Sequence, residues 1–190
     1  MTTRRWMAGA AAAGLALVAG PAGADVTIIG NGLAAECSSA ASGAANSQPS
    51  RADAEEQCTL AIEGEPLTPH QVAATYVNRG VLYLTDRAIA QARRDFGLAL
   101  RIEPNLPEAM VDDGAALVAG GHDREGAQEI TRGLALNPVQ PEKAYYNRAV
   151  AEERLGDLRS AYLDYRKASD LKPDWPLPKT ELARFRVSAP

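Results

Sequence analysis

Apolar and small residues recur every three or four positions through most of the chain from residue 68 onwards, which predicts a succession of amphipathic helices. Pro104, Pro138 and Pro173 each follow such a stretch, at separations of 34 and 35 residues. A proline soon after a helix end stops the helix, because it lacks the backbone N–H that continuation requires. The pattern therefore predicts a repeating unit that contains two helices.

A shift of 69 residues, which is two such units, brings one part of the chain onto another. Residues 76–79, Tyr-Val-Asn-Arg, fall on residues 145–148, Tyr-Tyr-Asn-Arg, and Pro104 falls on Pro173. Small residues shared by the two parts, including Ala92, let the helices of a pair approach closely. One helix pair cannot bury both of its apolar faces, so successive pairs are expected to stack in chain order.

These positions resemble the tetratricopeptide repeat, a family whose unit is a pair of antiparallel helices. The first unit has the family pattern at Tyr76, Gly80, Tyr83, Ala92, Phe96, Ala99 and Pro104. The third has it at Tyr145, Ala149, Gly156, Ala161, Tyr165, Ala168 and Pro173, with Glu152 as a departure. The middle unit has Met110, Gly114, Leu117, Gly121, Ile130 and Pro138. Its Gly126 and Gly133 stand where alanine is expected, and helical glycine costs about 1 kcal/mol against alanine, so we expect this unit to be the least stable.

The resemblance implies an all-α fold, a right-handed superhelix of antiparallel helix hairpins with a C-terminal capping helix. The three repeats are expected at residues 67–175, preceded at residues 25–66 by an extended segment and a degenerate hairpin. Residues 176–190 are expected to form the capping helix and tail, with the helix itself at residues 179–187. Trp175 lies at the corner, and the apolar contacts of the cap are expected to be Leu182, Phe185 and Val187.

Residues 1–24 have the features of a signal peptide. Two arginines precede an uncharged run at residues 7–20, and a small-residue site then predicts cleavage between Ala24 and Asp25. A retained membrane anchor is the alternative, although a spanning helix needs roughly 20 apolar residues. We therefore expect a periplasmic protein without stable membrane insertion after cleavage. The arginine pair also resembles a twin-arginine signal, so unfolded and folded export both remain open.

Export would decide the chemistry of Cys37 and Cys58, the two cysteines of the chain. In an oxidising compartment such a pair tends to form a disulfide, which would here join the two helices of the degenerate hairpin. The first of these helices is expected at residues 32–41, and a loop of small polar residues follows at 42–51. The alternative is two buried free thiols.

Composition and motifs narrow the class of function. The net charge is −4 and no basic stripe is present, so we expect no nucleic-acid partner. His70 and His122 each stand alone, and no spacing of His, Cys, Asp and Glu resembles a metal site. Nucleophile motifs and phosphate-binding loops are also absent from the sequence. We expect neither catalysis nor a cofactor, and we expect another protein or a peptide as the partner.

By resemblance, one face of the first helix of each repeat lines a concave groove that binds a peptide or a helix. The family commonly places an amide there that hydrogen-bonds a bound peptide backbone, and Asn78, Asp112 and Asn147 share this position. The predicted groove residues are Val77, Asn78, Val81, Val111, Asp112, Ala115, Tyr146, Asn147 and Val150. For the polar three, the alternative is a bridge between neighbouring helices, which would also satisfy a buried amide.

The groove departs from one subclass of the family, which holds the terminal carboxylate of a partner with lysines and arginines. Val77, Val111 and Tyr146 stand where that subclass has a lysine. An extended peptide or a helix with apolar anchors therefore suits this groove better. We expect an adaptor or scaffold of the bacterial cell envelope; the alternative is a passive structural or stress-related envelope protein without a defined ligand.

Two arginines are candidates for ion pairs within a hairpin. Arg79 and Arg148 each precede an aspartate by sixteen residues, Asp95 and Asp164 respectively. We expect each pair to join the two helices of its repeat, whereas the middle repeat has two acids at these positions, which would repel. The alternative is a pair of exposed arginines, whose ion pairs would contribute little to stability.

Overall fold

The computed structural model describes residues 5–8, 32–43 and 50–188, which contain nine helices and two short strands. The helices are α1 (Leu33–Ser42), α2 (Arg51–Gly64), α3 (Pro69–Thr85), α4 (Ile89–Ile102), α5 (Pro107–Ala119), α6 (Asp123–Ala135), α7 (Pro141–Arg154), α8 (Leu158–Leu171) and α9 (Pro176–Leu182). The strands are β1 (Arg5–Ala8) and β2 (Phe185–Ser188). The predicted cleavage site at Ala24 and Asp25 lies outside the described residues.

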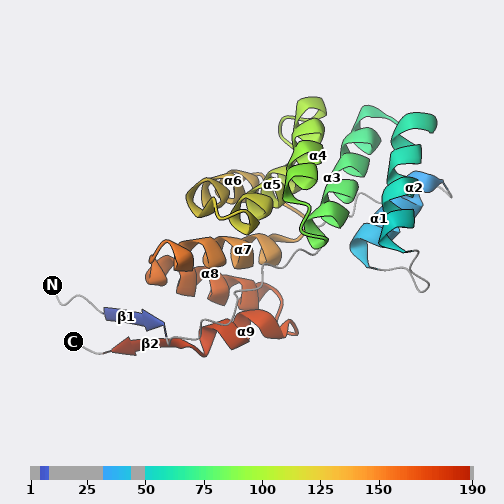
Figure 1. Cartoon of the computed structure of the whole chain (residues 1–190). Helices are drawn as coiled ribbons and strands as arrows, with labels where there is room; N and C mark the ends of the chain where they lie inside the picture. The colour runs from blue at the N-terminus through green and yellow to red at the C-terminus, as the bar shows by residue number, and fades with distance from the viewer. Residues whose placement is uncertain (1–4, 9–31, 44–49, 189–190) are drawn as a thin grey trace.

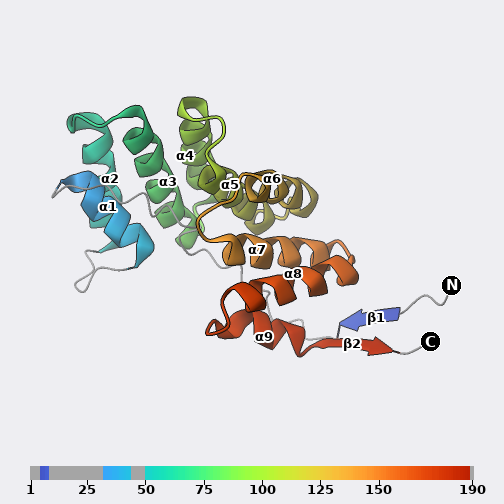
Figure 2. The ribbon, with the colours of Figure 1, turned by 180° about the vertical axis from the view of Figure 1, so that it is seen from behind.

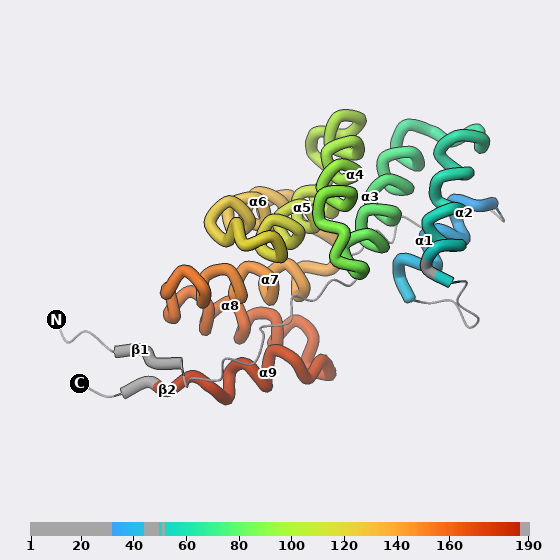
Figure 3. The backbone as a smooth tube through the Cα atoms, viewed as in Figure 1, coloured from blue at the N-terminus to red at the C-terminus, as the bar shows by residue number. Residues whose placement is uncertain are grey.

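The first eight helices form four hairpins that stack in chain order, from α1/α2 to α7/α8, and α9 covers the last one (Figure 1). First helices of successive hairpins contact one another, α1 with α3, α3 with α5 and α5 with α7. Within the described residues, no comparable contact joins the second helices of successive hairpins. The first helices therefore form the inner layer of a helical-repeat solenoid, whose path is traced from behind in Figure 2 and as a tube in Figure 3.

Helix ends follow local sequence signals. Thr68 and Gln71 form a reciprocal cap at the start of α3, in which each side chain accepts the backbone N–H of the other. Proline occupies the first turn of α3, α5, α7 and α9, where a missing N–H leaves no helical hydrogen bond unmade. The prolines at 104, 138 and 173 follow the last residues of α4, α6 and α8, as the sequence pattern predicts.

Glycine lets the backbones of the middle hairpin touch. A Cβ atom added to Gly126 of α6 would lie 2.7 Å from the carbonyl oxygen of Gly114 on α5. One added to Gly133 would lie 2.7 Å from a methyl of Val111 and 3.0 Å from the carbonyl oxygen of Pro107. Real Cβ contacts are almost never so short, so close packing of α5 against α6 requires these two glycines. Helix propensity alone does not reveal this requirement.

The α1/α2 hairpin matches the predicted degenerate unit, with α1 one residue later than expected. The buried apolar residues of α1 to α5, including Val77 and Phe96, form one continuous core, which we call the first core cluster. Cys37 of α1 and Cys58 of α2 are fully buried in it. Their Cα atoms lie 4.9 Å apart and their sulfur atoms lie at bonding distance, which fits the predicted disulfide. Glu65, just after α2, accepts the backbone N–H groups of Leu33 and Ala34 at the start of α1, which ties the two helices together a second time.

The C-terminal helix is shorter than expected. Helix α9 begins at Pro176 and ends at Leu182, and residues 185–188 form β2, antiparallel to β1. The prediction of a helix over residues 179–187 was therefore wrong at its C-terminal end, whereas the predicted all-α fold class is confirmed by the stacked helices. Arg184 pairs with both Glu181 and Glu153, which holds the chain after α9 against α7. Phe185 then packs its ring against Tyr162 and Tyr165 of α8, a contact that favours an extended backbone over another helical turn.

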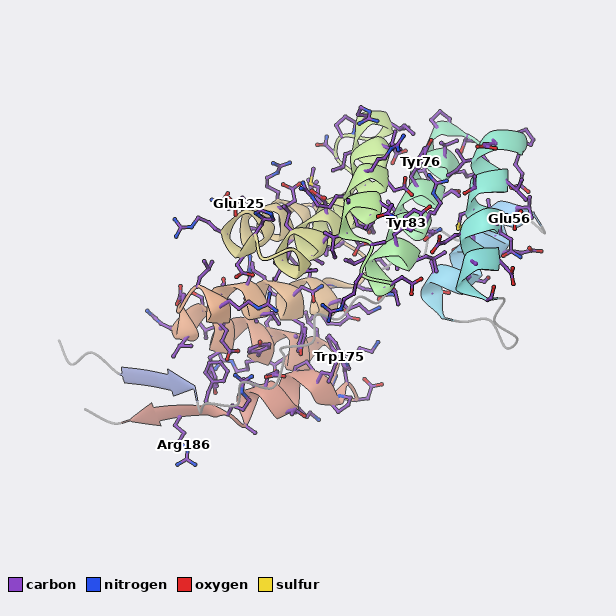
Figure 4. All side chains as sticks on the ribbon, viewed as in Figure 1. Glu56, Tyr76, Tyr83, Glu125, Trp175 and Arg186 are labelled. Atoms are coloured by element: carbon purple, nitrogen blue, oxygen red, sulfur yellow. A yellow bond between two sulfur atoms is a disulfide. The ribbon has the colours of Figure 1, made fainter. Side chains whose placement is uncertain are left out.

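The capping role itself is supported by aromatic contacts. Trp175 lies at the corner before α9 (Figure 4) and packs against Tyr146 of α7, with ring centroids 5.1 Å apart. Leu182 and Phe185 pack on the second core cluster, which is formed by buried residues of α5 to α8, including Tyr165. The side chain of Val187 lies outside the described part. Among the described residues, no helix is long and apolar enough to cross a membrane.

The predicted arginine–aspartate pairs are confirmed in the first and third repeats. Arg79 donates from Nε and a terminal nitrogen to Asp95 at 2.7 and 3.0 Å, and Arg148 donates likewise to Asp164 at 2.6 and 3.0 Å. The remaining terminal nitrogen of each arginine donates to a threonine of the preceding hairpin at 2.9 or 3.0 Å. Each arginine therefore joins the two helices of its own hairpin to the neighbouring hairpin.

We predict that Arg79→Ala lowers the free energy of unfolding by about 2 kcal/mol, because it leaves the buried Asp95 without its bidentate partner. Arg93 is the matched control: it makes a similar fork with Asp113 but is more exposed, so Arg93→Ala is expected to cost less than about 1 kcal/mol. Urea unfolding at low and high salt measures both. An equal loss of unfolding free energy in the two variants would contradict the stronger role given to the Arg79–Asp95 pair.

Candidate functional site

The predicted groove residues lie at equivalent positions of α3, α5 and α7, in the inner layer. In the full-length chain each of the nine is at most 3% exposed. The larger apolar members divide between the two core clusters, with Val77 and Val81 in the first and Val111, Tyr146 and Val150 in the second. The fold thus brings the predicted set together along one layer, and its role in binding stays a prediction.

Asn78 and Asp112, on α3 and α5, each have a side-chain atom without a hydrogen-bond partner. Asn78 is 1% exposed and its Nδ2 donates to nothing, while Asp112 is 2% exposed and its Oδ2 accepts from nothing. A buried donor or acceptor left unpaired costs about 1–3 kcal/mol, and native proteins keep few of them. Neither of these atoms bridges neighbouring helices, so each keeps its hydrogen-bonding capacity for another group.

The hydrogen-bonding groups of Asp112 can resemble those of the asparagines at the equivalent positions. Burial raises the pKa of Asp112 well above its ordinary value, Glu108 adds to the increase and Lys143 opposes it. Burial also lowers the pKa of Lys143, against the opposing charge of Asp112. A carboxyl that stays protonated presents one O–H donor and one carbonyl acceptor, as an amide does. The middle position can therefore offer the same hydrogen-bonding groups as Asn78.

A second feature escaped the sequence analysis. A cleft of about 700 Å³ lies between the middle and third repeats, and we call it the α6–α7 cleft. Its walls come from α4, α5, α6 and α7, with apolar surface from Leu117, Ala127 and Leu155. The exposed Glu125 lies on its α6 side (Figure 4). None of the nine predicted groove residues lines it.

Glu152 lines this cleft at a position where the third repeat differs from the first. It stands 69 residues after Tyr83, so it occupies the position that an aromatic ring fills in the first repeat. Tyr83 packs on the first core cluster and lies against the guanidinium of Arg79, whereas Glu152 has one oxygen 3.9 Å from Arg148 Nε. The other oxygen is buried and has no partner. Burial, assisted by Asp164 and opposed by Arg148, raises the pKa of Glu152 to about 7.

This pKa predicts a pH-dependent loss of stability. Because the folded-state pKa of about 7 exceeds the ordinary value of 4.5, the stability that Glu152 contributes is complete below pH 4.5 and is lost as the pH rises through 7. The free energy of unfolding of the unaltered chain should therefore fall between about pH 5 and about pH 8, the range in which Glu152 titrates. We expect Glu152→Gln to remove the part of this fall that is due to Glu152. Urea unfolding of both proteins at the two pH values measures it. A difference in the free energy of unfolding between the two proteins that is the same at both pH values would contradict the raised pKa of Glu152.

Groups suited to metal binding do not gather in the described part of the chain. No three of its His, Cys, Asp and Glu residues are placed to hold a metal ion. His70 pairs with Glu103 at 2.9 Å on the surface, and His122 is an exposed residue before α6.

Comparison with known proteins agrees with this geometry. Residues 142–174 match the family model described as tetratricopeptide repeat. No curated protein is similar enough in sequence to count as a relative. Among solved structures, the tetratricopeptide-repeat domain of Arabidopsis OM64 is 19% identical, with a TM-score of 0.57 over 62% of this chain and 96% of that one.

Two further solved structures concern peptide binding. The first such domain of Spaghetti (RPAP3), bound to the HSP90 peptide SRMEEVD, is 22% identical with a TM-score of 0.56, over 60% of this chain and 92% of that one. YrrB, described as having an unusual peptide-binding site, is 18% identical with a TM-score of 0.55, over 68% of this chain and 64% of that one. The chain therefore carries a tetratricopeptide repeat at residues 142–174 and has the fold of a tetratricopeptide-repeat protein.

Proposed function

We propose that this chain is an adaptor or assembly factor of the bacterial cell envelope that binds an extended peptide or a helix of another protein along its inner layer. The observation that carries the proposal is the pair of unpartnered atoms on α3 and α5, Asn78 Nδ2 and Asp112 Oδ2. A peptide backbone supplies carbonyl oxygens and N–H groups at regular intervals, which are the groups that a donor and an acceptor in a row would take up.

The surroundings of these atoms favour a partner with apolar anchors. Val77, Val81 and Val150 are all buried apolar neighbours in the predicted groove, and no lysine takes the place of Val77. The HSP90 peptide that is bound to the RPAP3 domain, SRMEEVD, ends in an acidic residue. The present groove is therefore proposed to bind an internal segment or a helix instead of a terminal carboxylate.

The proposed setting follows from residues 1–24, which have the pattern of a cleavable export signal. We propose cleavage before Asp25, residence in the periplasm and oxidation of Cys37 with Cys58 there. The form that meets its partner would then be the cleaved chain. Binding measurements should accordingly use protein isolated from the periplasm of a bacterial host, with its N-terminus read by mass spectrometry.

Selection from a displayed library of random peptides, followed by fluorescence polarisation, tests the proposal. We expect Asn78→Ala combined with Asp112→Ala to weaken the selected peptides about tenfold or more, since each loses a hydrogen bond to the partner. The free energy of unfolding should change little, because Asn78 Nδ2 and Asp112 Oδ2 have no hydrogen-bond partner in the free chain. Gln91→Ala, on the exposed face of α4, is the control and should change neither quantity.

The rival function, a passive envelope protein without a defined ligand, gives a different outcome. Selection would then enrich no peptide, or the double variant would bind the selected peptides as tightly as the unaltered chain. Tyr146→Ala is unsuitable as a groove variant, because the Tyr146 ring packs against Tyr165 and Trp175 and its loss would disturb the cap.

A further inference from the structure

We propose that the α6–α7 cleft is a second binding site, separate from the predicted groove, that takes a primary ammonium group carried on an apolar stem. Two observations lead to it. The third repeat has Glu152 where the first repeat has a tyrosine ring, which leaves a cleft of about 700 Å³ in the size range of ligand sites. One carboxylate oxygen of Glu152 is also buried without a partner.

Four arginines line the cleft, and three of them, Arg93, Arg132 and Arg148, are engaged with other acids. Arg148 donates from Nε and from both terminal nitrogens to Asp164 and Thr131, and its Nε lies 3.9 Å from Glu152. Arg93 forms a two-bond ion pair with Asp113. Arg132 lies 3.1 Å from Glu129, three residues earlier on α6. Among the partly buried acids that line the cleft, Asp113, Glu129 and Glu152, Glu152 is the one without a full cationic partner.

The geometry of this surplus acid selects an ammonium over a guanidinium. Glu152 has one free oxygen, whereas a guanidinium fork pairs best with two oxygens of the same carboxylate. An ammonium is a compact donor that can pair with a single oxygen. Glu152 lines the cleft and its free oxygen is covered in the unliganded chain. The last side-chain torsion of a glutamate has a broad energy profile, so this oxygen can turn to meet a ligand.

The walls of the cleft suit an aliphatic stem. Leu117, Ala127 and Leu155 supply apolar surface, and Leu155 is 45% exposed although it is a large hydrophobic residue. Four or so methylene groups laid on this surface would be removed from water, which favours binding. A lysine side chain of a partner protein and a free aliphatic diamine share this chemistry.

Charge around Glu152 makes such binding depend on pH. Arg148 on its own helix favours the ionised carboxyl, while Asp164 of α8 and Asp157 in the preceding turn oppose it, and Glu129 and Arg132 line the α6 side of the cleft. An incoming ammonium favours ionisation further. Binding should therefore strengthen as Glu152 loses its proton between about pH 6 and pH 8, on either side of its pKa of about 7.

The test is an NMR titration of the full chain with two probes, Nα-acetyl-lysine N-methylamide and cadaverine. We expect saturable shifts of the backbone amides of Ala127, Thr131 and Leu155, with millimolar affinity as is usual for a single small contact. Glu152→Gln should weaken binding about tenfold, and Glu152→Tyr, which restores the residue type of the first repeat, should abolish it. Glu125→Gln, at an exposed acid of the same cleft, is the control and should leave affinity within about twofold.

The source of the ammonium is read from the two probes. Tighter binding of the lysine derivative indicates a side chain of a partner protein, and tighter binding of cadaverine indicates a free diamine. The lysine derivative acetylated at Nε should give no shifts at these residues. The proposal is overturned if neither probe shifts them at about 50 mM, which is well above millimolar affinity, or if Glu152→Gln and Glu125→Gln affect the titration equally.

Discussion

Replacing both Gly126 and Gly133 by alanine is expected to lower the free energy of unfolding by about 3 kcal/mol, although alanine is the residue that the repeat pattern favours at both positions. Each new Cβ would meet atoms of α5 at 2.7 Å, so α5 and α6 would have to separate. Forcing an extra methyl into a packed interface typically costs about 1–3 kcal/mol, which outweighs a gain of about 1 kcal/mol per residue in helix propensity.

Gly97 on α4 is the matched control for this prediction. It is also a helical glycine, but a Cβ added there would meet no atom within 4 Å. Gly97→Ala should therefore raise stability by up to about 1 kcal/mol, through propensity alone. Urea unfolding followed by circular dichroism measures all three proteins. Stabilisation by the double alanine variant would mean that α5 and α6 do not pack at backbone contact.

Replacing both Cys37 and Cys58 by alanine is expected to lower the free energy of unfolding by about 3 kcal/mol. A disulfide between them closes a loop at a sequence separation of 21 residues, which restricts the unfolded chain. Without it the unfolded chain has more conformational entropy and is favoured. The effect should concentrate in α1 and α2, which form the end of the row and have a neighbouring hairpin on one side. Hydrogen exchange of these helices, with urea unfolding of the whole chain, gives the measurement.

Reduction provides the control for the cysteine prediction. A thiol reductant should destabilise the unaltered chain by a similar amount and should not affect the alanine variant. Alkylation of the protein isolated from the periplasm without reductant should label neither cysteine. Labelling of both would show free thiols and would contradict the proposed bridge.

The sequence carried enough information to predict the helical rows, because their causes are local and periodic. Prolines 104, 138 and 173 ended helices as expected, and the sixteen-residue spacing of Arg79 and Asp95 placed the pair across one hairpin. The fold of stacked hairpins followed from a 69-residue self-match that needed no knowledge of contacts.

The features that were missed depend on contacts between distant residues. The requirement for Gly126 comes from the backbone of another helix, and the end of α9 at Leu182 depends on what Arg184 and Phe185 meet on α7 and α8. Glu152 was visible as a departure from the repeat, but the cleft that it leaves requires the positions of four helices. The burial of Asn78 and Asp112 could be expected from the pattern, whereas the lack of partners for their side-chain atoms could not.

The central claim is that the inner layer formed by the first helices binds a segment of another protein. Methyl-labelled NMR of the periplasmic protein with a selected peptide tests it most directly, through nuclear Overhauser effects between peptide and protein. The account predicts effects from the methyl groups of Val77, Val111 and Val150, on α3, α5 and α7. Effects confined to residues of α4, α6 and α8, the second helices, would contradict it.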